Sequence, residues 1–386
     1  MALLHLLHGW AHRTGATLCA VTVDHGLRPA ARAEAAMVAE VCEGSGIDHT
    51  TLLWEGWDGT GNLQDQARRA RYALMSDWAQ AANLGAVAIG HTADDQAETF
   101  LMRLTRGAGV DGLSGMAPRR RSFGVDWLRP LLGVMRADLR AYLAARRLGW
   151  VDDPSNANPQ FARVRARQLL EVLAPLGLDA AALRATTLRL AEARDALDLA
   201  AQEAARRIAT VEAGDVKMER AGFLALPAEL RRRLLSHALA WVASAEYRPR
   251  HDALAEALAA VAEGRDMSLH GCLLVVRRTH LRLTRELQAV KGKTAAPGAI
   301  WDRRWRLTAP EGTPTEGMKI AALGEAGLAA CPKWRETGLK RSTLLAAPGV
   351  WRGADLVAAP LAGQPSGWSA ELARGESDYF SSLLSH

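Results

Sequence analysis

The sequence has few cysteines, few lysines and no long apolar run. The cysteines are scattered and form no C-x-x-C pair; they are Cys19, Cys42, Cys272 and Cys331. This pattern favours neither a zinc site nor a redox motif. No stretch approaches the roughly 18 apolar residues that a membrane span needs, and residues 1–7 are too short and too interrupted for a secretory signal. We therefore expect a cytoplasmic protein with no membrane partner.

The composition that remains is typical of a globular protein. Of the 386 residues, 49% are hydrophobic and 23% are charged, and a chain of this length holds about two or three domains. Arginine is concentrated in residues 101–170, where 13 arginines face five acidic residues. Guanidinium groups bind phosphate through paired hydrogen bonds, so this region favours a nucleic-acid partner. The alternative to a nucleic-acid partner is that these arginines form an ordinary solvated face, in a chain that uses arginine in preference to lysine.

The first half alternates short apolar strands with helices. Strands are expected at 17–23, 49–54 and 85–90, and helices at 2–12, 31–42, 64–82 and 94–106. This alternation predicts an α/β fold with a parallel sheet, in which ligands bind at the carboxyl ends of the strands. Asp24, His25 and His91 follow such strand ends.

The second half changes to long helices and then to short strands. Helices are expected at 178–207, 227–242 and 252–263, and a hairpin at 268–284. The sequence predicts one domain over 1–175, a second over 176–287, a linker over 288–299 and a small β-containing domain over 300–386. The linker is predicted from its glycine, proline and small polar residues.

The segment from Gly90 to Thr99 carries the most informative cluster of polar residues. The members at spacing i, i+3, i+4 and i+7 are His91, Asp94, Asp95 and Glu98. This spacing puts them on one face of a helix. Carboxylates so close together repel each other unless a cation lies among them, and a metal ion, a substrate ammonium group or a magnesium nucleotide would serve.

Local structure explains part of the same segment without a ligand. Thr92 and Asp95 fit a capping box, and acidic residues are favoured in a first helical turn. On the opposite face, Phe100, Leu101 and Leu104 are expected to pack on the sheet.

Farther on, Arg163, Arg165 and Arg167 alternate in a segment that looks helical. Alternate helical positions do not share a face, so we expect these arginines to wrap around an RNA backbone.

In these segments the sequence resembles the tRNA(Ile)-lysidine synthetases, a family of the ATP pyrophosphatase (PP-loop) group. The motifs are VDHGLR at 23–28, N-x-Q-x-x-A-R-x-x-R-Y at 62–72, GHTADDQAET at 90–99, RLTRGAGVDGLSGM at 103–116, RPLL at 129–132, DDPSN at 152–156 and the alternate arginines. The resemblance implies an α/β, parallel-sheet PP-loop domain of the adenine nucleotide alpha hydrolase-like type. A helical or α+β substrate domain that binds tRNA and a small C-terminal β-containing domain would follow it.

The resemblance also implies a reaction and its partners. ATP would adenylate the C2 carbonyl oxygen of the wobble cytidine in tRNA(Ile) with a CAU anticodon, and the amine of L-lysine would displace AMP to give lysidine. ATP and Mg²⁺ are the implied cofactors, and a homodimer is an implied oligomeric state.

Residue roles follow from the matching motifs. The residues implied in catalysis are Asp95 and Glu98, which would hold the lysine ammonium, and His91 beside the ATP phosphates. The residues implied in nucleotide binding are Asp24, His25, Asp94 and Arg106. The residues implied to face the tRNA are Arg163, Arg165 and Arg167.

One motif of the family is missing from the sequence. The phosphate loop S-G-G-x-D-S does not occur, and the chain begins at the helix that follows this loop in the family. We expect that the natural start lies upstream or that the chain is truncated, that its sheet lacks a central strand, and that it binds ATP poorly. The alternatives are a non-catalytic RNA-binding remnant and a metal-dependent hydrolase that uses the acidic face. A tRNA thiolation enzyme would need paired cysteines.

Overall fold

The structure is a computed structural model that describes residues 1–386 except 27–29, 56–62, 152–159, 246 and 385–386. The end of the VDHGLR motif, Asn62 and the DDPSN turn therefore lie outside the described residues, as does the side chain of Gln64. The chain divides into two compact units, which meet between Arg194 and Asp195. The predicted boundaries at 175, 287 and 299 stay predictions. Among the described helices, none is both long and apolar enough to cross a membrane.

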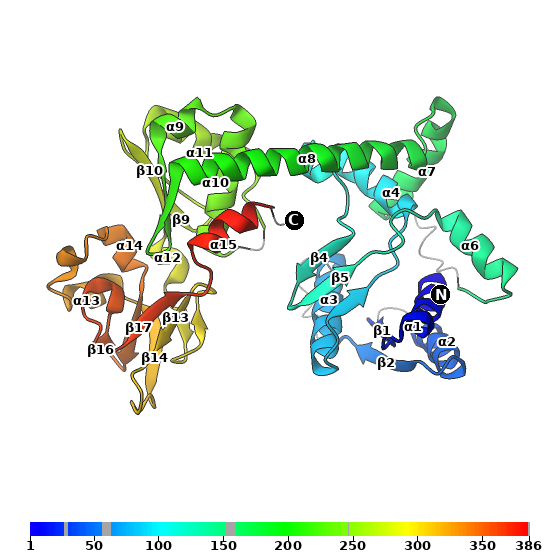
Figure 1. Ribbon diagram of the computed structural model, residues 1–386, viewed down its shortest axis with the longest axis horizontal. Helices are drawn as coiled ribbons and strands as arrows, with labels where there is room; N and C mark the ends of the chain where they lie inside the picture. Colours follow the sequence, from blue (N-terminus) through cyan, green and yellow to red (C-terminus); the bar gives the residue numbers. More distant parts are fainter. Residues whose placement is uncertain (27–29, 56–62, 152–159, 246, 385–386) are drawn as a thin grey trace. The chain divides into compact units, whose positions relative to one another are not determined.

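The first unit contains two small sheets (Figure 1). Strands β1 and β2 pair in parallel, and β3 pairs in parallel with β5, which pairs antiparallel with β4. The bounds are β1 (Cys19–Asp24), β2 (Asp48–Leu53), β3 (Ala86–Ala88), β4 (Arg119–Ser122) and β5 (Val125–Leu128). The parallel pairs confirm the predicted α/β class. The β4–β5 hairpin is an addition that the sequence pattern did not predict.

The helices of the first unit are α1 (Ala2–Thr14), α2 (Ala30–Gly44), α3 (Leu63–Ala81), α4 (Ala93–Leu104), α5 (Val110–Leu113), α6 (Arg136–Ala145), α7 (Ala162–Leu173), the short η2 (Ala174–Leu176) and the first part of α8 (Ala180–Ile208). Helices α1, α2, α3, α4 and α8 agree with those expected from the sequence, whereas α5, α6 and η2 were not predicted. Helix α3 packs on the strands, where its Met75 and Ala79 share a core with Val87, Val125 and Trp127.

Helix α4 packs against other helices. Its buried Phe100 and Leu101 join Ala166 of α7 and Leu183 of α8 in one cluster, whereas Leu104 is 49% exposed. The prediction that this apolar face packs on the sheet is therefore wrong. Apolar residues of α7 and α8 pack against Phe100 and Leu101 instead.

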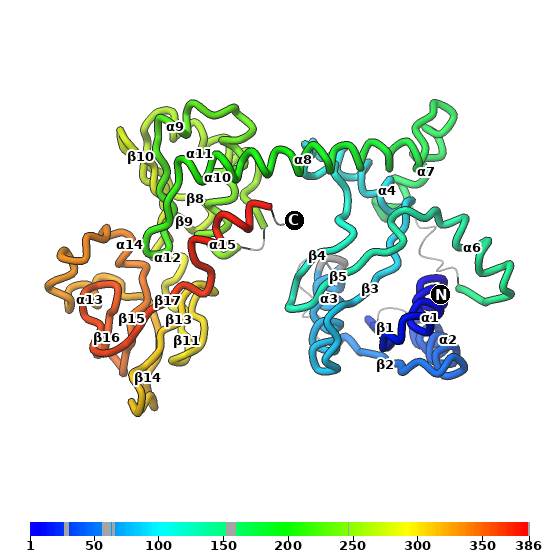
Figure 2. The backbone as a smooth tube through the Cα atoms, in the orientation of Figure 1, coloured from blue at the N-terminus to red at the C-terminus, as the bar shows by residue number. Residues whose placement is uncertain are grey.

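The second unit is built on a five-stranded sheet in the order β6-β7-β10-β9-β8. Its strands are β6 (Ala209–Glu212), β7 (Asp215–Glu219), β8 (Met267–Leu269), β9 (Cys272–Val276) and β10 (His280–Arg285), and its helices are α9 (Arg220–Ala225), α10 (Ala228–Ala243) and α11 (His251–Glu263). Figure 2 labels β8, β9 and β10 in the part of the tube that also carries α10 and α11. The antiparallel pair β9–β10 confirms the hairpin predicted at 268–284. Helix α10 fills the core of this part.

The end of the chain adds two further sheets, in the orders β11-β14-β15-β16 and β12-β13-β17. The strands are β11 (Thr294–Ala295), β12 (Ile300–Trp301), β13 (Trp305–Thr308), β14 (Met318–Ala322), β15 (Pro348–Arg352), β16 (Asp355–Ala358) and β17 (Ser369–Leu372). The helices are α12 (Leu287–Val290), α13 (Gly324–Ala329), α14 (Arg341–Leu345), α15 (Glu376–Ser381), η3 (Trp334–Thr337), η4 (Pro360–Ala362) and η5 (Ser382–Leu384). These sheets confirm the β-containing character expected of residues 300–386.

Candidate active site

The first turn of α4 is held by a reciprocal cap. The backbone N–H and the hydroxyl of Thr92 each donate to Asp95 Oδ2 at 2.8 Å, and Asp95 N donates to Thr92 Oγ1 at 3.3 Å. This confirms the predicted capping box, which satisfies backbone donors that a helix start leaves free. It occupies only one of the two carboxylate oxygens of Asp95.

Asp94 joins α4 to α6. Its Oδ2 accepts a hydrogen bond of 2.7 Å from the backbone N–H of Arg136, the first residue of α6, and α6 has no side-chain cap of its own. A carboxylate at a helix start is favoured by the free N–H groups and by the helix dipole. Asp94 therefore fixes the position of α6, and with it the Arg136 side chain, next to the other acids of α4.

Glu98 is the most deeply buried carboxylate of the cluster, with 1% of its side chain exposed. Its Oε1 accepts from Arg167 Nε at 3.0 Å and from Arg136 Nη2 at 3.4 Å. Its Oε2 is buried and has no hydrogen-bond partner among the described residues. A buried carboxylate is tolerated when it is paired, but an unsatisfied oxygen costs free energy unless a donor reaches it.

Asp95 also keeps one oxygen without a hydrogen bond in the part of the chain that the structure describes. Its Oδ1 lies 3.8 Å from Arg136 Nη2 and 3.8 Å from Arg163 Nη1, which is an ion pair but too long for a hydrogen bond. The same face of α4 thus offers one free oxygen on each of Asp95 and Glu98, with three arginines around them.

The arginines of α7 are arranged differently from the sequence expectation. Arg163 and Arg167 lie four residues apart and both face the acids of α4, while the buried Val164 and Ala166 occupy the neighbouring positions of the helix. Arg165 is exposed and donates to the backbone oxygen of Gln160 at 3.0 Å. The prediction that no two of these arginines share a face is wrong for Arg163 and Arg167, because positions i and i+4 do share one.

Asp24 and His25 close β1, as predicted. Asp24 Oδ1 accepts from Gly26 N at 2.9 Å in a tight turn, where Gly26 has a φ of 63°. His25 Nε2 accepts from Arg71 Nε at 3.1 Å, and its ring meets Trp54 edge-on at 5.7 Å between centroids. Burial, followed by the charge of Arg71, lowers the pKa of His25. A neutral His25 that accepts at Nε2 carries its proton on Nδ1, which is buried without a partner among the described residues.

His91 follows β3 and is neutral at physiological pH. Burial is the largest cause that lowers its pKa, to about 4; Asp95 opposes the shift, and Arg129, Arg163 and Arg68 add to it. Its Nδ1 is buried and, among the described residues, has no partner. The Nδ1 atoms of His25 and His91 and the Oε2 of Glu98 are therefore buried without a hydrogen bond to any residue that the structure describes, although buried polar atoms normally have one.

The structure brings six of the ten predicted residues together in one cluster. Asp24 and His25 lie at the end of β1, with Arg71 and Trp54 beside His25, and Arg106 and Arg165 also lie outside the cluster. The cluster unites His91, Asp94, Asp95, Glu98, Arg163 and Arg167. Arg106 is exposed beyond the far end of α4, roughly 18 Å from Asp94 along the helix axis at 1.5 Å per residue. Arg165 is exposed and donates to the backbone of Gln160 instead of contacting the acids. The roles of all these residues stay predictions.

Two arginines of the site were not assigned a role from the sequence. Arg136 contacts both Asp95 and Glu98, and it stands among 13 arginines with nothing in its spacing to distinguish it. Arg71 lies inside the motif at 62–72, and its place in that motif could have marked it as a site residue. Among the described residues, no three His, Cys, Asp or Glu side chains gather as metal ligands.

Comparison of the sequence with known proteins identifies the family of the chain. A sequence family described as a PP-loop domain matches residues 1–173. A protein of Ruegeria pomeroyi named tRNA(Ile)-lysidine synthase is 51% identical over 100% of this chain and 91% of its own length. The chain belongs to the tRNA(Ile)-lysidine synthase family. Synthases of the same name from Hyphomonas neptunium and Wolbachia pipientis are 41% and 32% identical, over 77% and 80% of this chain and 81% and 74% of their own.

Membership of the lysidine synthase family confirms the resemblance inferred from the motifs. One solved structure, the U34-tRNA thiolase NcsA of Methanococcus maripaludis with its [4Fe-4S] cluster, is 18% identical with a TM-score of 0.43, over 50% of this chain and 68% of its own. That likeness is too weak to bear on the reaction. The family therefore rests on the sequence relatives and on the PP-loop match.

Proposed function

We propose that this chain is an ATP-dependent carbon–nitrogen ligase that joins lysine to C2 of the wobble cytidine of tRNA(Ile), giving lysidine. The observation that carries the proposal is Glu98, a buried carboxylate with one unpartnered oxygen beside Asp95, in a chain of the lysidine synthase family. An ammonium group would supply the missing donors, and charge-assisted hydrogen bonds are the strong ones.

The first step activates the base. The C2 carbonyl oxygen of cytidine attacks the α-phosphorus of ATP, a new P–O bond forms, and the bond to the bridging oxygen of pyrophosphate breaks. The neutral His25 and His91 lie at the strand ends where a nucleotide binds in such folds. We infer that the unpartnered Nδ1–H of His25 donates to this nucleotide.

The second step transfers the amine. An amino group of lysine attacks C2, the C2–O bond breaks, AMP leaves with the oxygen, and the amine loses a proton. Lysine has two amino groups, and one that is held as ammonium has no lone pair for attack. Asp95 and Glu98 therefore anchor the amino group that does not react, which leaves the other free to reach C2.

The remaining assignments concern the ATP phosphates and the metal ion that accompanies them. Asp94 stays in the proposal as a neighbour of the ATP phosphates, although one of its oxygens caps α6. Arg106 has no support from the geometry of the cluster. A Mg²⁺ ion that arrives with ATP takes most of its ligands from phosphate oxygens and water, so we assign it no protein ligand among the described residues.

The tRNA assignment rests on charge. Arg163, Arg165 and Arg167 lie on α7 in the arginine-rich region, and we propose that they meet the phosphates of tRNA(Ile) near the anticodon. The chain would act in the cytoplasm. Its proposed homodimer is tested by light scattering of the purified protein, where a single monomer mass at all concentrations would contradict it.

Two assays on the wild-type chain test the proposed function. With saturating ATP and tRNA(Ile) bearing a CAU anticodon, we expect tRNA-dependent exchange of pyrophosphate into ATP without lysine. With lysine added, labelled lysine should enter the tRNA at one site. tRNA binding without either reaction would favour the non-catalytic alternative and contradict the proposal.

A further inference from the structure

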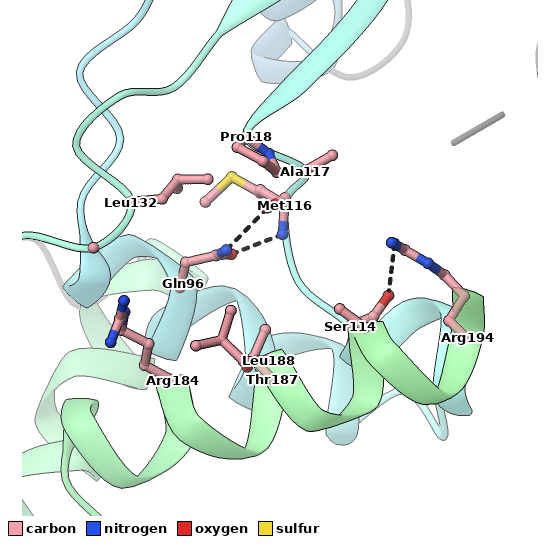
Figure 3. Close-up of a pocket in the computed structure, with 12 residues that line it drawn as sticks. Gln96, Ser114, Met116, Ala117, Pro118, Leu132, Arg184, Thr187, Leu188 and Arg194 are labelled. Carbon is pink, nitrogen blue, oxygen red and sulfur yellow. Dashed lines mark hydrogen bonds between the residues drawn. The ribbon is translucent and has the colours of Figure 1, made fainter. Parts of the chain in front are cut away.

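A pocket that none of the roles above uses lies between α4, the 114–118 loop and α8 (Figure 3). Its volume is about 140 Å³. Met116, Pro118, Leu132 and Leu188 contribute apolar walls, and Leu188 is 49% exposed. All of its lining residues belong to the first unit.

Most polar groups around the pocket are already satisfied. Gln96 exchanges two hydrogen bonds with the backbone of Met116, at 3.0 and 2.7 Å. Ser114 accepts from Arg194 at 3.1 Å, and the Thr187 hydroxyl donates to a backbone oxygen at 2.8 Å. These contacts build a fixed wall that has little capacity left for a ligand.

Arg184 is the exception. Its guanidinium has no hydrogen bond or ion pair to any described residue, and it lies against Gly133, where an added Cβ would stand 3.2 Å from Arg184 Nη2. The absence of a side chain at Gly133 lets the guanidinium lie at the edge of the pocket. An apolar hollow with one unpaired cationic donor at its edge fits a ring that carries an acceptor.

The size of the pocket narrows the choice of ring. A buried apolar cavity of about 150 Å³ binds benzene, so a hollow of this volume holds one six-membered ring, whereas a two-ring purine would extend out of it. Both pyrimidine bases are single rings with a carbonyl oxygen at C2, which accepts hydrogen bonds from a guanidinium. Bases of single-stranded RNA loops can be unstacked and inserted into such sites.

We propose that this pocket binds a pyrimidine base from the anticodon loop of the tRNA, other than the cytidine that reacts. The inference rests on the proposed function for its RNA. Gln96 is about 100° around the helix from Asp95 and about 200° from Glu98, so a base beside Gln96 lies on a different face of α4 from the acids that hold lysine. The pocket is thus a second base site that positions the loop.

Two variants with matched controls test the pocket. Ala191→Leu places a larger side chain on the pocket wall, and Ala193→Leu makes the same change at an exposed position of α8. Arg184→Ala removes the donor, and Arg189→Ala removes an exposed arginine of the same helix. The probe is a fluorescent stem–loop RNA with a CAU anticodon, bound without ATP or lysine. Each loop pyrimidine outside the wobble position is replaced in turn by an abasic nucleotide.

The wild type should lose affinity by about tenfold at one abasic position, the scale of a single inserted base. Ala191→Leu and Arg184→Ala should bind the intact loop about tenfold more weakly and show no further loss at that position. The two controls should behave as the wild type. The proposal would be overturned if the abasic position lowered the affinity equally in the wild type, the two pocket variants and the two controls.

A second arm separates RNA from a free nucleotide as the source of the base. CMP and UMP are titrated into the wild type and Arg184→Ala, with binding followed by NMR. Binding of free CMP that depends on Arg184, without any coupling in the stem–loop, would overturn the RNA assignment. Lysine incorporation by the wild type is measured separately, so a failure of the pocket and a failure of the ligase proposal give different results.

Discussion

At the scale of single residues, the site depends on carboxylates that are only half satisfied. The sequence placed Asp95 and Glu98 on one helical face, because their i, i+3 spacing requires it. The prediction that His91 shares this face is wrong, because α4 begins at Ala93 and His91 precedes its N-cap. The sequence did not reveal that Arg136 and Arg167 neutralise one oxygen of Glu98. Contacts between α4 and residues 38 to 69 positions later in the chain leave no trace in local spacing.

His91 provides a pH test. Its pKa is lowered to about 4, first by burial, whereas in the unfolded chain a histidine titrates near 6.5. Below pH 6.5 the unfolded chain therefore binds a proton that the folded chain does not. Stability should fall as the pH drops from about 6.5 towards 4. The buried His237, with a pKa also lowered to about 4, acts in the same direction.

Imidazole signals in NMR spectra check this prediction. The His91 signal, assigned by its loss in His91→Gln, should hold its neutral chemical shift down to about pH 5. His91→Gln should also unfold less steeply with acid than the wild type. A His91 midpoint near 6.5 would contradict the burial and the neighbouring arginines described here.

At the scale of elements, the sequence predicted the long segments well and the short exposed ones poorly. Helices α4, α8 and α10 have clear apolar periodicity and begin and end near the predicted residues. Strand β4 reads Arg-Arg-Arg-Ser and is largely exposed, so it has no alternation to detect. It forms because β5 pairs with it, which is a tertiary effect that propensity does not encode.

The cap that Asp94 provides to α6 gives a prediction at this scale. Asp94→Ala removes the acceptor of the Arg136 N–H, and losing such a cap costs about 1 kcal/mol. Amide hydrogen exchange in the first turn of α6 should become about fivefold faster. Asp138→Ala, an exposed acid of the same turn, is the control, and equal exchange rates in the two variants would contradict the cap.

Helix α7 gives a second prediction, for RNA binding. Loss of Arg163, Arg165 and Arg167 together should weaken tRNA binding and lower the slope of log affinity against log salt. The slope should fall by about 1 for the exposed Arg165, and by more only if Arg163 and Arg167, which pair with the acids of α4, also reach phosphates. Fluorescence polarisation between low and moderate salt measures this slope. Arg189→Ala should leave the slope unchanged. An unaltered slope in the triple variant would show that α7 does not meet the phosphates.

At the scale of the whole molecule, the order of motifs predicted more than any single motif. Strand–helix alternation indicated the α/β class, and the motifs from 23–28 to 163–167 indicated the family that the relatives confirm. The domain boundaries predicted at 175, 287 and 299 stay predictions. The division between Arg194 and Asp195 lies inside α8, where an unbroken helical pattern gives no signal.

The claim on which the whole account depends is that the acids of α4 hold an ammonium group of lysine. The most direct test is the KM for lysine in Glu98→Gln, which keeps the shape but removes the charge. A charge-assisted hydrogen bond contributes about 1.5–3 kcal/mol, so this KM should rise by about 10- to 150-fold. Pyrophosphate exchange without lysine should stay unchanged, and Glu171→Gln, an exposed acid of α7, should match the wild type. An unchanged lysine KM, or an equal loss of exchange, would contradict the account.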